Sequence, residues 1–255
     1  KKMLTDSHCH LYFDNLKNNL KDVLIRANEM GVDRFICPST NMKDVHKCLM
    51  IAKKYNNIYC SAGVHPHDTN KVSKNYTSEV CELMNEKSMI AVGEIGLDYF
   101  RNISSKETQL KCFKEQLKIA QDIKKPVIIH NRNSDKDMAR ILGEFSEVKG
   151  VAHCFSSDIH MAKKFLELGY YISFSGNLTF KNSHLPEVAR QLPLDRILIE
   201  TDSPFLSPEP YRGKPNEPAR VRFVAEKLAI IFKLPLERIA EITSENTSAI
   251  FGIND

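Results

Sequence analysis

The stretch MIAVGEIGL, residues 89–97, carries a single charged side chain, Glu94, in an otherwise apolar run. Continuous apolar runs of this length are typical of parallel strands that are covered on both faces. A carboxylate inside such a strand costs on the order of several kcal/mol of desolvation unless a positive group lies beside it. The run therefore predicts a buried strand and a cation next to Glu94.

Seven further apolar runs of this kind are spaced along the chain, with polar segments of helical periodicity between them. These runs are MLTDSH (3–8), RFICPS (34–39), IYCSAGVH (58–65), PVIIHN (126–131), GVAHCF (150–155), YYISFSG (170–176) and RILIETD (196–202). Eight strands alternating with helices in a chain of 255 residues predict an α/β fold, a (β/α)8 TIM barrel. Because no linker or shift in composition interrupts the pattern, residues 1–255 are expected to form a single domain.

Three of the polar segments, residues 19–30, 104–124 and 158–168, have the clearest helical spacing. We expect the second to begin with a capping box formed by Ser104 and Glu107. The first and third are followed by glycine, which commonly ends a helix.

The last part of the chain departs from the alternating pattern. Residues 203–218 contain five prolines and predict a long loop after the eighth strand, of the kind that is usually functional. From residue 218 onward the spacing predicts two or three helices, which we expect to cover the outside of the barrel.

Composition excludes several classes of protein. A net charge of +4 and a pI near 8.6 are too mild for a dedicated non-specific nucleic-acid binder. The seven cysteines are odd in number and contain no C-x-x-C pair, which argues against a disulfide framework and a thiolate zinc site. A reducing, cytoplasmic location fits this pattern. No apolar run is long enough to span a membrane.

Histidines gather where the predicted strands end. In a strand, residues i and i+2 share a face, so His8 and His10 can reach one point together. Taken alone, this pair fits a solvated strand end equally well, and a lone buried His130 is more often a hydrogen-bonded core residue. However, six of the nine histidines lie at or just past an apolar run: His8, His10, His65, His67, His130 and His153. Barrel enzymes place their sites at the carboxyl ends of the strands, so these side chains are expected to meet.

The candidate metal ligands come from five of the strands and include two carboxylates. They are His8, His10, Glu94, His130, His153 and Asp202. This mixture of nitrogen and oxygen suits zinc or manganese, with magnesium less favoured. Six ligands exceed the needs of one tetrahedral ion, whereas two divalent ions bridged by Glu94 would use them all. Glu200 is expected deeper, in a supporting position, and Cys9 and Cys154 are expected to turn away as packing residues.

These residues lie in motifs that resemble the TatD family of metal-dependent deoxyribonucleases, within the amidohydrolase-like superfamily. The matching stretches are TDSHCH (5–10), AGVHPH (62–67), VGEIGLDY (92–99), IHNR (129–132), HCFS (153–156), SFSGNLTFKN (173–182), IETDSPFLSPEPYRGKPNEP (199–218) and NTSAIFGI (246–253). The resemblance implies one ion bound by His8, His10, Glu94 and Asp202, and a second bound by Glu94, His130 and His153. It also implies that His65 and Arg132 bind a substrate phosphate.

The resemblance and the ligand chemistry together predict a hydrolase that cleaves phosphodiester bonds of DNA through a metal-activated water, with Asp202 accepting its proton. Single-stranded DNA or 3′ ends are the expected partner, cleaved in the 3′ to 5′ direction. The basic segment Arg212–Lys214 and the neighbouring Tyr211 either hold a strand or form a solvated turn.

Two other functions are considered. The first is hydrolysis of amides, lactones or phosphotriesters; many such barrels use a carboxylated lysine on the fourth strand, but residues 91–101 contain none. The second is a non-catalytic nucleic-acid-binding protein with a structural metal. Structural sites are coordinatively closed, whereas six ligands shared by two ions leave open positions.

Overall fold

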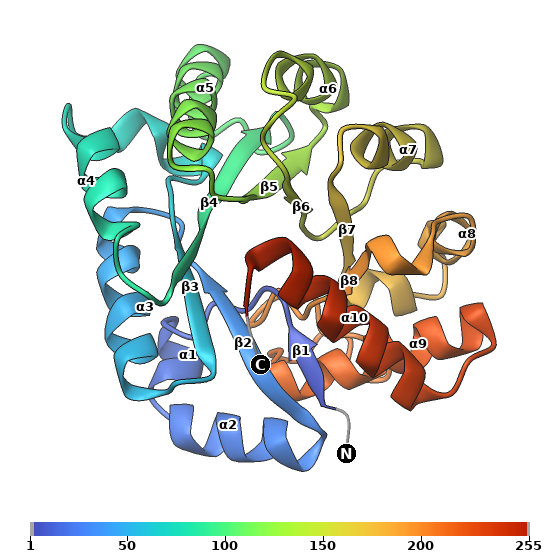
Figure 1. The fold of residues 1–255 in the computed structure, drawn as a ribbon. Helices are drawn as coiled ribbons and strands as arrows, with labels where there is room; N and C mark the ends of the chain where they lie inside the picture. Colours follow the sequence, from blue (N-terminus) through green and yellow to red (C-terminus); the bar gives the residue numbers. More distant parts are fainter. Residues whose placement is uncertain (1–2, 254–255) are drawn as a thin grey trace.

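Eight parallel strands form one sheet in the order β1 to β8, as seen in the computed structural model, which describes residues 3–253 (Figure 1). The strands are β1 (Leu4–Asp6), β2 (Val32–Pro38), β3 (Ile58–Ala62), β4 (Met89–Asp98), β5 (Val127–Arg132), β6 (Gly150–Ala152), β7 (Tyr171–Phe174) and β8 (Ile197–Ile199). Each lies within or across one predicted apolar run. The prediction of a (β/α)8 TIM barrel is confirmed.

The barrel closes between its first and last strands through the segments that follow them. The Ser7 N–H donates to the carbonyl of Ile199 at 3.0 Å, and the Asp202 N–H donates to the carbonyl of His8 at 2.9 Å. A third bond runs from the His10 N–H to the carbonyl of Ser203 at 2.8 Å. Closure therefore takes place at the carboxyl-terminal rim, through backbone groups that include those of the candidate ligands His8, His10 and Asp202.

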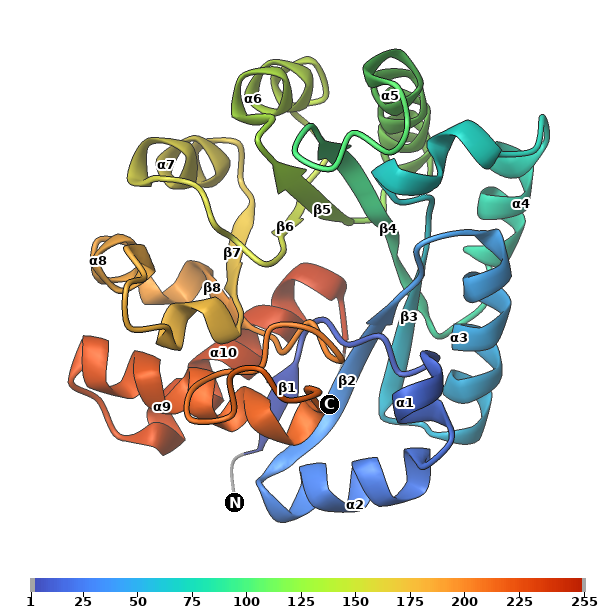
Figure 2. The same cartoon turned by 180° about the vertical axis from the view of Figure 1, so that it is seen from behind.

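Helices surround the strands on the outside (Figures 1 and 2). The α-helices are α1 (Asp14–Lys17), α2 (Leu20–Glu29), α3 (Met42–Lys54), α4 (Tyr76–Leu83), α5 (Lys106–Ile123), α6 (Asp135–Glu144), α7 (Ile159–Glu167), α8 (Leu185–Arg190), α9 (Val221–Phe232) and α10 (Leu236–Phe251). Short 3-10 turns are η1 (Pro66–Lys71), η2 (Gly176–Thr179), η3 (Leu194–Arg196) and η4 (Pro218–Arg220).

Local signals explain where two of these helices begin. The Asp158 carboxylate accepts a hydrogen bond from the Met161 N–H at 3.0 Å and caps α7. The capping box predicted at Ser104 is wrong by one residue, because Ser105 caps α5 instead. The hydroxyl of Ser104 is buried and donates to the carbonyl of His67 at 3.0 Å, so a tertiary contact takes it away from the helix.

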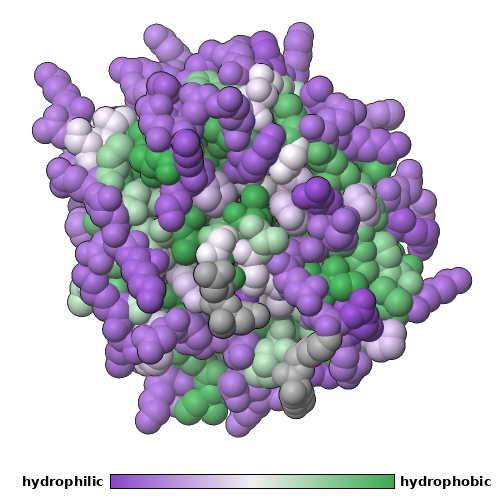
Figure 3. Space-filling view, viewed as in Figure 1, coloured by the Kyte–Doolittle hydropathy of each residue, from purple (hydrophilic) through white to green (hydrophobic). Residues whose placement is uncertain are grey.

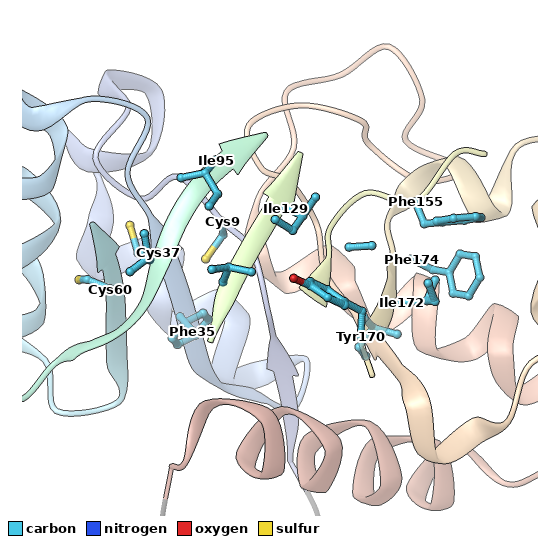
Figure 4. Packing of buried hydrophobic residues seen from close by; sticks show 14 of the residues in the cluster. Cys9, Phe35, Cys37, Cys60, Ile95, Ile129, Phe155, Tyr170, Ile172 and Phe174 are labelled. Atoms are coloured by element: carbon cyan, nitrogen blue, oxygen red, sulfur yellow. The ribbon is translucent and has the colours of Figure 1, made fainter. Parts of the chain in front are cut away.

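The main core lies between the strands and the surrounding helices (Figure 4). Cys9 packs there near Cys37 and Cys60, as predicted for Cys9. The sulfur atoms of Cys37 and Cys48 are 3.7 Å apart, and all seven cysteines are free. The thiols of this cluster therefore act as small apolar side chains.

A second core fills the amino-terminal end of the barrel interior. Phe251 and Ile253 pack there with residues from several strands, including Ile36, Ile90 and Ile128. Helix α10 crosses this end of the barrel in Figure 1. The expectation that the last helices cover only the outside is wrong for α10, because its apolar end closes the interior.

The long loop predicted at residues 203–218 lies over the opposite, carboxyl-terminal end, where it is drawn in orange in Figure 2. Buried Asn216 holds it: the side-chain amide donates to the carbonyls of Thr201 at 3.0 Å and Phe205 at 2.6 Å. The loop is thus tied to the end of β8 despite its five prolines.

The face of the molecule in Figure 3 is mainly hydrophilic, with separate apolar areas between charged side chains. Across residues 3–253, no helix has both the length and the apolar character needed to cross a membrane.

Gly96 fixes the approach of β4 to β5 and allows a direct stability test. Its φ is +145°, and it pairs in register with His130. A Cβ at this position would lie 2.0 Å from the carbonyl oxygen of His130. Gly96→Ala should therefore lower the free energy of unfolding by about 3 kcal/mol, measured by urea denaturation. Gly143→Ala in α6 is the matched control, because a Cβ there meets nothing within 4 Å. That change should leave stability unchanged or raise it by up to ~1 kcal/mol. Equal losses in both variants would contradict the packing described.

Candidate metal centre

All six predicted ligands reach one region at the carboxyl-terminal rim of the barrel. They are His8 and His10 after β1, Glu94 in β4, His130 in β5, His153 after β6 and Asp202 after β8. Four of them are buried, and His130 and Asp202 are partly accessible. Sequence positions almost 200 residues apart meet there because parallel strands of a closed barrel end at a common edge.

The first group of donor atoms comes from His8, His10, Glu94 and Asp202. Nε2 of His8 lies 3.2 Å from Nε2 of His10 and 3.3 Å from Oε2 of Glu94. Oδ1 of Asp202 lies 3.3 Å from Nε2 of His10 and 3.7 Å from Nε2 of His8. The separation from His10 Nε2 to Glu94 Oε2 is 3.8 Å.

The second group is built around the other oxygen of the same glutamate. Oε1 of Glu94 lies 2.8 Å from Nε2 of His153 and 3.0 Å from Nδ1 of His130. These two nitrogens are 3.3 Å apart. Nε2 of His65 is also 3.3 Å from Oε1 of Glu94. Each oxygen of Glu94 therefore faces its own set of imidazole nitrogens.

These separations fit divalent metal ions. Metal–nitrogen and metal–oxygen bonds of ~2.0–2.2 Å give tetrahedral ligand edges of about 3.3–3.6 Å, close to the separations within the first group. Nε2 of His8 and Nε2 of His10 face each other, and two neutral imidazoles of this kind need a shared proton or a cation between them. The donor set, nitrogen with carboxylate oxygen, is one that zinc and manganese accept.

The electrostatics keep the central carboxylate ionised. Burial alone would raise the pKa of Glu94, but the facing imidazoles, with His153 the strongest, hold it well below its usual value. The pKa of Asp202 is also lowered: burial opposes this, and the hydrogen bond to His10 outweighs it only together with the charges of the surrounding imidazoles. Two carboxylates that stay charged in a buried pocket attract cations.

Two further carboxylates orient the imidazoles, and sequence reasoning missed one of them. Nε2–H of His130 donates to Oδ2 of Asp98 at 3.2 Å, and His67 donates to the same oxygen at 2.8 Å. Nδ1–H of His153 donates to Glu200 at 3.2 Å, which agrees with the supporting position expected for Glu200. Carboxylate–histidine pairs of this kind fix the tautomer and raise ligand basicity. Asp98 could have been found from its place at the end of the glutamate-bearing strand.

The two residues expected at a substrate phosphate take different positions. His65 lies inside the ligand cluster, and burial lowers the pKa of its imidazole to about 4, so the ring is neutral at pH 7. Arg132 is exposed at the rim, with its guanidinium 4.0 Å from the ring centre of Phe100. Of these two residues, Arg132 is the one exposed to solvent.

The prediction that Cys154 is a packing residue is wrong. Its backbone is left-handed, with φ of +45°, and its thiol lies 3.3 Å from the hydroxyl of Ser175 at the half-buried rim. The turn after β6 sends the side chain to the rim, which strand alternation alone does not predict.

The basic segment of the long loop and the neighbouring Tyr211 pack against other elements of the protein. The guanidinium of Arg220 lies 4.4 Å from the ring centre of Tyr211, and Phe223 contacts the same ring at 5.3 Å between centroids. Arg212 stacks on Phe180 at 4.2 Å. Tyr211 is therefore held within the protein.

The barrel and the ligand cluster at its rim define the class as that of metal-dependent hydrolases with a TIM-barrel fold. The family model of TatD related DNase matches residues 5–252. The chain belongs to the TatD family, and the resemblance seen in its motifs is confirmed.

Individual relatives cover nearly the whole chain. An uncharacterized metal-dependent hydrolase of Buchnera aphidicola, BU355, is 42% identical over an alignment of 264 positions that covers 98% of this chain and 99% of that protein. The 3'-5' ssDNA/RNA exonuclease TatD of Salmonella typhimurium is 30% identical over 91% of this chain and 92% of its own length. The crystal structure of YjjV from Escherichia coli superposes with a TM-score of 0.93 at 31% identity, covering 98% of each chain.

Proton release on metal binding follows from the histidines. Burial would lower the pKa values of His10, His130 and His153, but the facing carboxylates raise all three above the usual value. Without metal these rings keep their protons to a higher pH than free histidine, and an ion must displace them. Mn2+ affinity should therefore fall at least about tenfold from about pH 8 to about pH 6. Calorimetry in buffers of different ionisation enthalpy should detect the released protons, and a pH-independent affinity would count against this cluster as the site.

Asp98→Asn tests the orienting carboxylate. Asparagine keeps the shape but loses the charge that holds the imidazole of His130, so Mn2+ affinity should fall about 10- to 100-fold. Asp122→Asn is the control, because Asp122 only forms an exposed ion pair with Lys118 in α5. Both variants should be titrated with Mn2+ after a check of the fold by circular dichroism. Unchanged Mn2+ affinity in Asp98→Asn would contradict the orienting role of Asp98.

Proposed function

We propose that this chain hydrolyses phosphodiester bonds of DNA as a 3′–5′ exodeoxyribonuclease at a two-metal site. The observation that carries the proposal is the position of Glu94, whose oxygens face separate donor groups at 2.8–3.8 Å. One carboxylate shared by two ions is the arrangement used for in-line displacement at phosphorus. The Salmonella relative named as an exonuclease on single-stranded DNA and RNA supports the same substrate class.

The residues that would hold the ions divide along Glu94. His8, His10, Asp202 and Glu94 would hold the first ion, and Glu94, His130 and His153 would hold the second. Zinc or manganese suits these donors best, with magnesium third. Divalent ions there supply a nucleophilic water at neutral pH and offset charge on the phosphoryl oxygens.

Asp202 is the proposed general base. Its lowered pKa leaves it ionised at pH 7, and its side chain keeps 14% exposure at the mouth of the cluster, while that of Glu94 keeps 3%. Among the carboxylates of the cluster, Asp202 is thus the one that an incoming water and substrate can approach. A base at this position would take the proton of the attacking water.

Arg132 and His65 would bind the phosphate from different sides. The exposed guanidinium of Arg132 can donate two hydrogen bonds to phosphate oxygens. Nδ1 of His65 accepts a hydrogen bond from the His67 N–H, so the one proton of its neutral ring lies on Nε2, 3.3 Å from Oε1 of Glu94, and would be offered to a phosphate oxygen that approaches there. Both would lower the energy of a phosphorane-like transition state.

His130→Ala tests the proposal. Loss of one second-group ligand should reduce Mn2+-dependent cleavage of end-labelled single-stranded DNA at least about 100-fold, with metal content lowered as well. His46→Ala, at an exposed position of α3, is the control and should keep the full rate. Metal content by elemental analysis and a melting curve should accompany each assay. Full activity of His130→Ala would refute the two-metal assignment.

A further inference from the structure

Two exposed phenylalanines flank the metal centre. Phe100 retains 58% of its accessible surface and Phe205 retains 52%, although most aromatic rings among residues 3–253 are buried or partly buried. Phe100 follows β4 and Phe205 follows β8. In a closed barrel with the strand order β1 to β8, these strands stand on opposite sides, so the ligand cluster lies between the two rings.

Phe205 is held rigidly despite its exposure. Its ring lies 6.3 Å from that of His10 and 5.7 Å from that of Phe13, both in edge-to-face geometry. Its N–H donates to the carbonyl of Asp202 at 2.9 Å, and its carbonyl accepts from Asn216 at 2.6 Å. An exposed ring on a fixed backbone is pre-organised, and its position is set by two candidate metal ligands.

Phe100 is tied to the other side of the centre in a similar way. Its N–H donates to Oδ1 of Asp98 at 3.0 Å, while the other oxygen of Asp98 accepts from His130. The guanidinium of Arg132 lies 4.0 Å from the Phe100 ring centre, at cation–π distance. Each exposed ring is therefore connected through one hydrogen bond to a residue of the cluster or to the carboxylate that orients it.

We infer that Phe205 and the Phe100–Arg132 pair are positioning residues that stack unpaired bases on the two sides of the scissile phosphodiester. This inference rests on the proposed function. Aromatic faces bind any base, because every base has a π surface, and nearby arginine favours the phosphates. The bases of a duplex already stack on both faces, so only a locally unpaired strand can place bases on both rings. The two phenylalanines would thereby select single-stranded substrate.

The stacking role is tested by combining protein variants with modified substrates. Wild type and Phe205→Ala are compared on an oligodeoxynucleotide and on a series in which one nucleotide near the 3′ end at a time lacks its base. Phe205→Ala should raise KM for the intact strand about 5- to 100-fold with little change in kcat. On the oligonucleotide that lacks the stacked base, this penalty should disappear, since the interaction is already absent. Phe205→Trp keeps an aromatic ring at this position and should therefore have the wild-type KM.

Phe100→Ala is tested on the same series, and the nucleotide at which its penalty vanishes should differ from that of Phe205→Ala. Ile230→Ala is the control, because Ile230 is exposed to 73% on α9 and should leave both constants unchanged. A penalty that persists on every base-free oligonucleotide, or a failure of Phe205→Trp to restore KM, would overturn the inference.

The proposed function can fail separately. If wild type with Mn2+ hydrolyses bis(p-nitrophenyl) phosphate but no oligonucleotide, the DNA assignment falls, and the stacking inference falls with it. If wild type degrades the oligonucleotide and Phe205→Ala does so with the same KM, only the stacking inference is lost. Equal KM values of wild type for blunt duplex and single strand would also overturn it.

Discussion

The rest of this structure depends on one buried carboxylate in the fourth strand. Glu94 is almost inaccessible to water, and its two oxygens face five imidazole nitrogens that come from other strands or from the segments that follow them. A charge in that position is stable only if positive charge lies close to it on both sides. The strands on either side of β4, with the segments that follow them, supply His65 and His130, so a shift of either strand would break a contact with Glu94. The need to balance this buried charge therefore constrains the positions of the strands.

Barrel closure and ligand placement are achieved by the same short segments. The bonds that join the ends of β1 and β8 involve the backbones of His8, His10 and Asp202, whose side chains point into the cluster. The backbone thus uses its hydrogen bonds for the fold while alternate side chains serve the site. Hydrogen bonds also connect the site to the rim. The carbonyl of Asp202 accepts from the Phe205 N–H, and the carboxylate of Asp98 accepts from both His130 and the Phe100 N–H. Metal centre and rim are therefore joined by direct hydrogen bonds.

Sequence patterns located the strands well because buried parallel strands need continuous apolar runs, and no tertiary detail alters that need. They failed where a side chain had two possible uses. Ser104 has the residue type of a helix cap but its hydroxyl bonds to the carbonyl of His67. Cys154 follows a ligand in a strand-like run, but the chain has already turned there. The end of α10 is apolar on a terminal helix and enters the barrel instead of covering it.

The sequence by itself determined the barrel, the family and the set of residues able to bind metal, because strand periodicity and ligand chemistry are both written in residue type and spacing. Only the tertiary structure decided which oxygen of Glu94 each imidazole faces, and that His65 lies beside the same carboxylate. It also decided that Asp98 supports His130 and that Phe205, not Tyr211, keeps a free ring at the rim. These outcomes rest on distances between segments far apart in the chain, which local sequence does not encode.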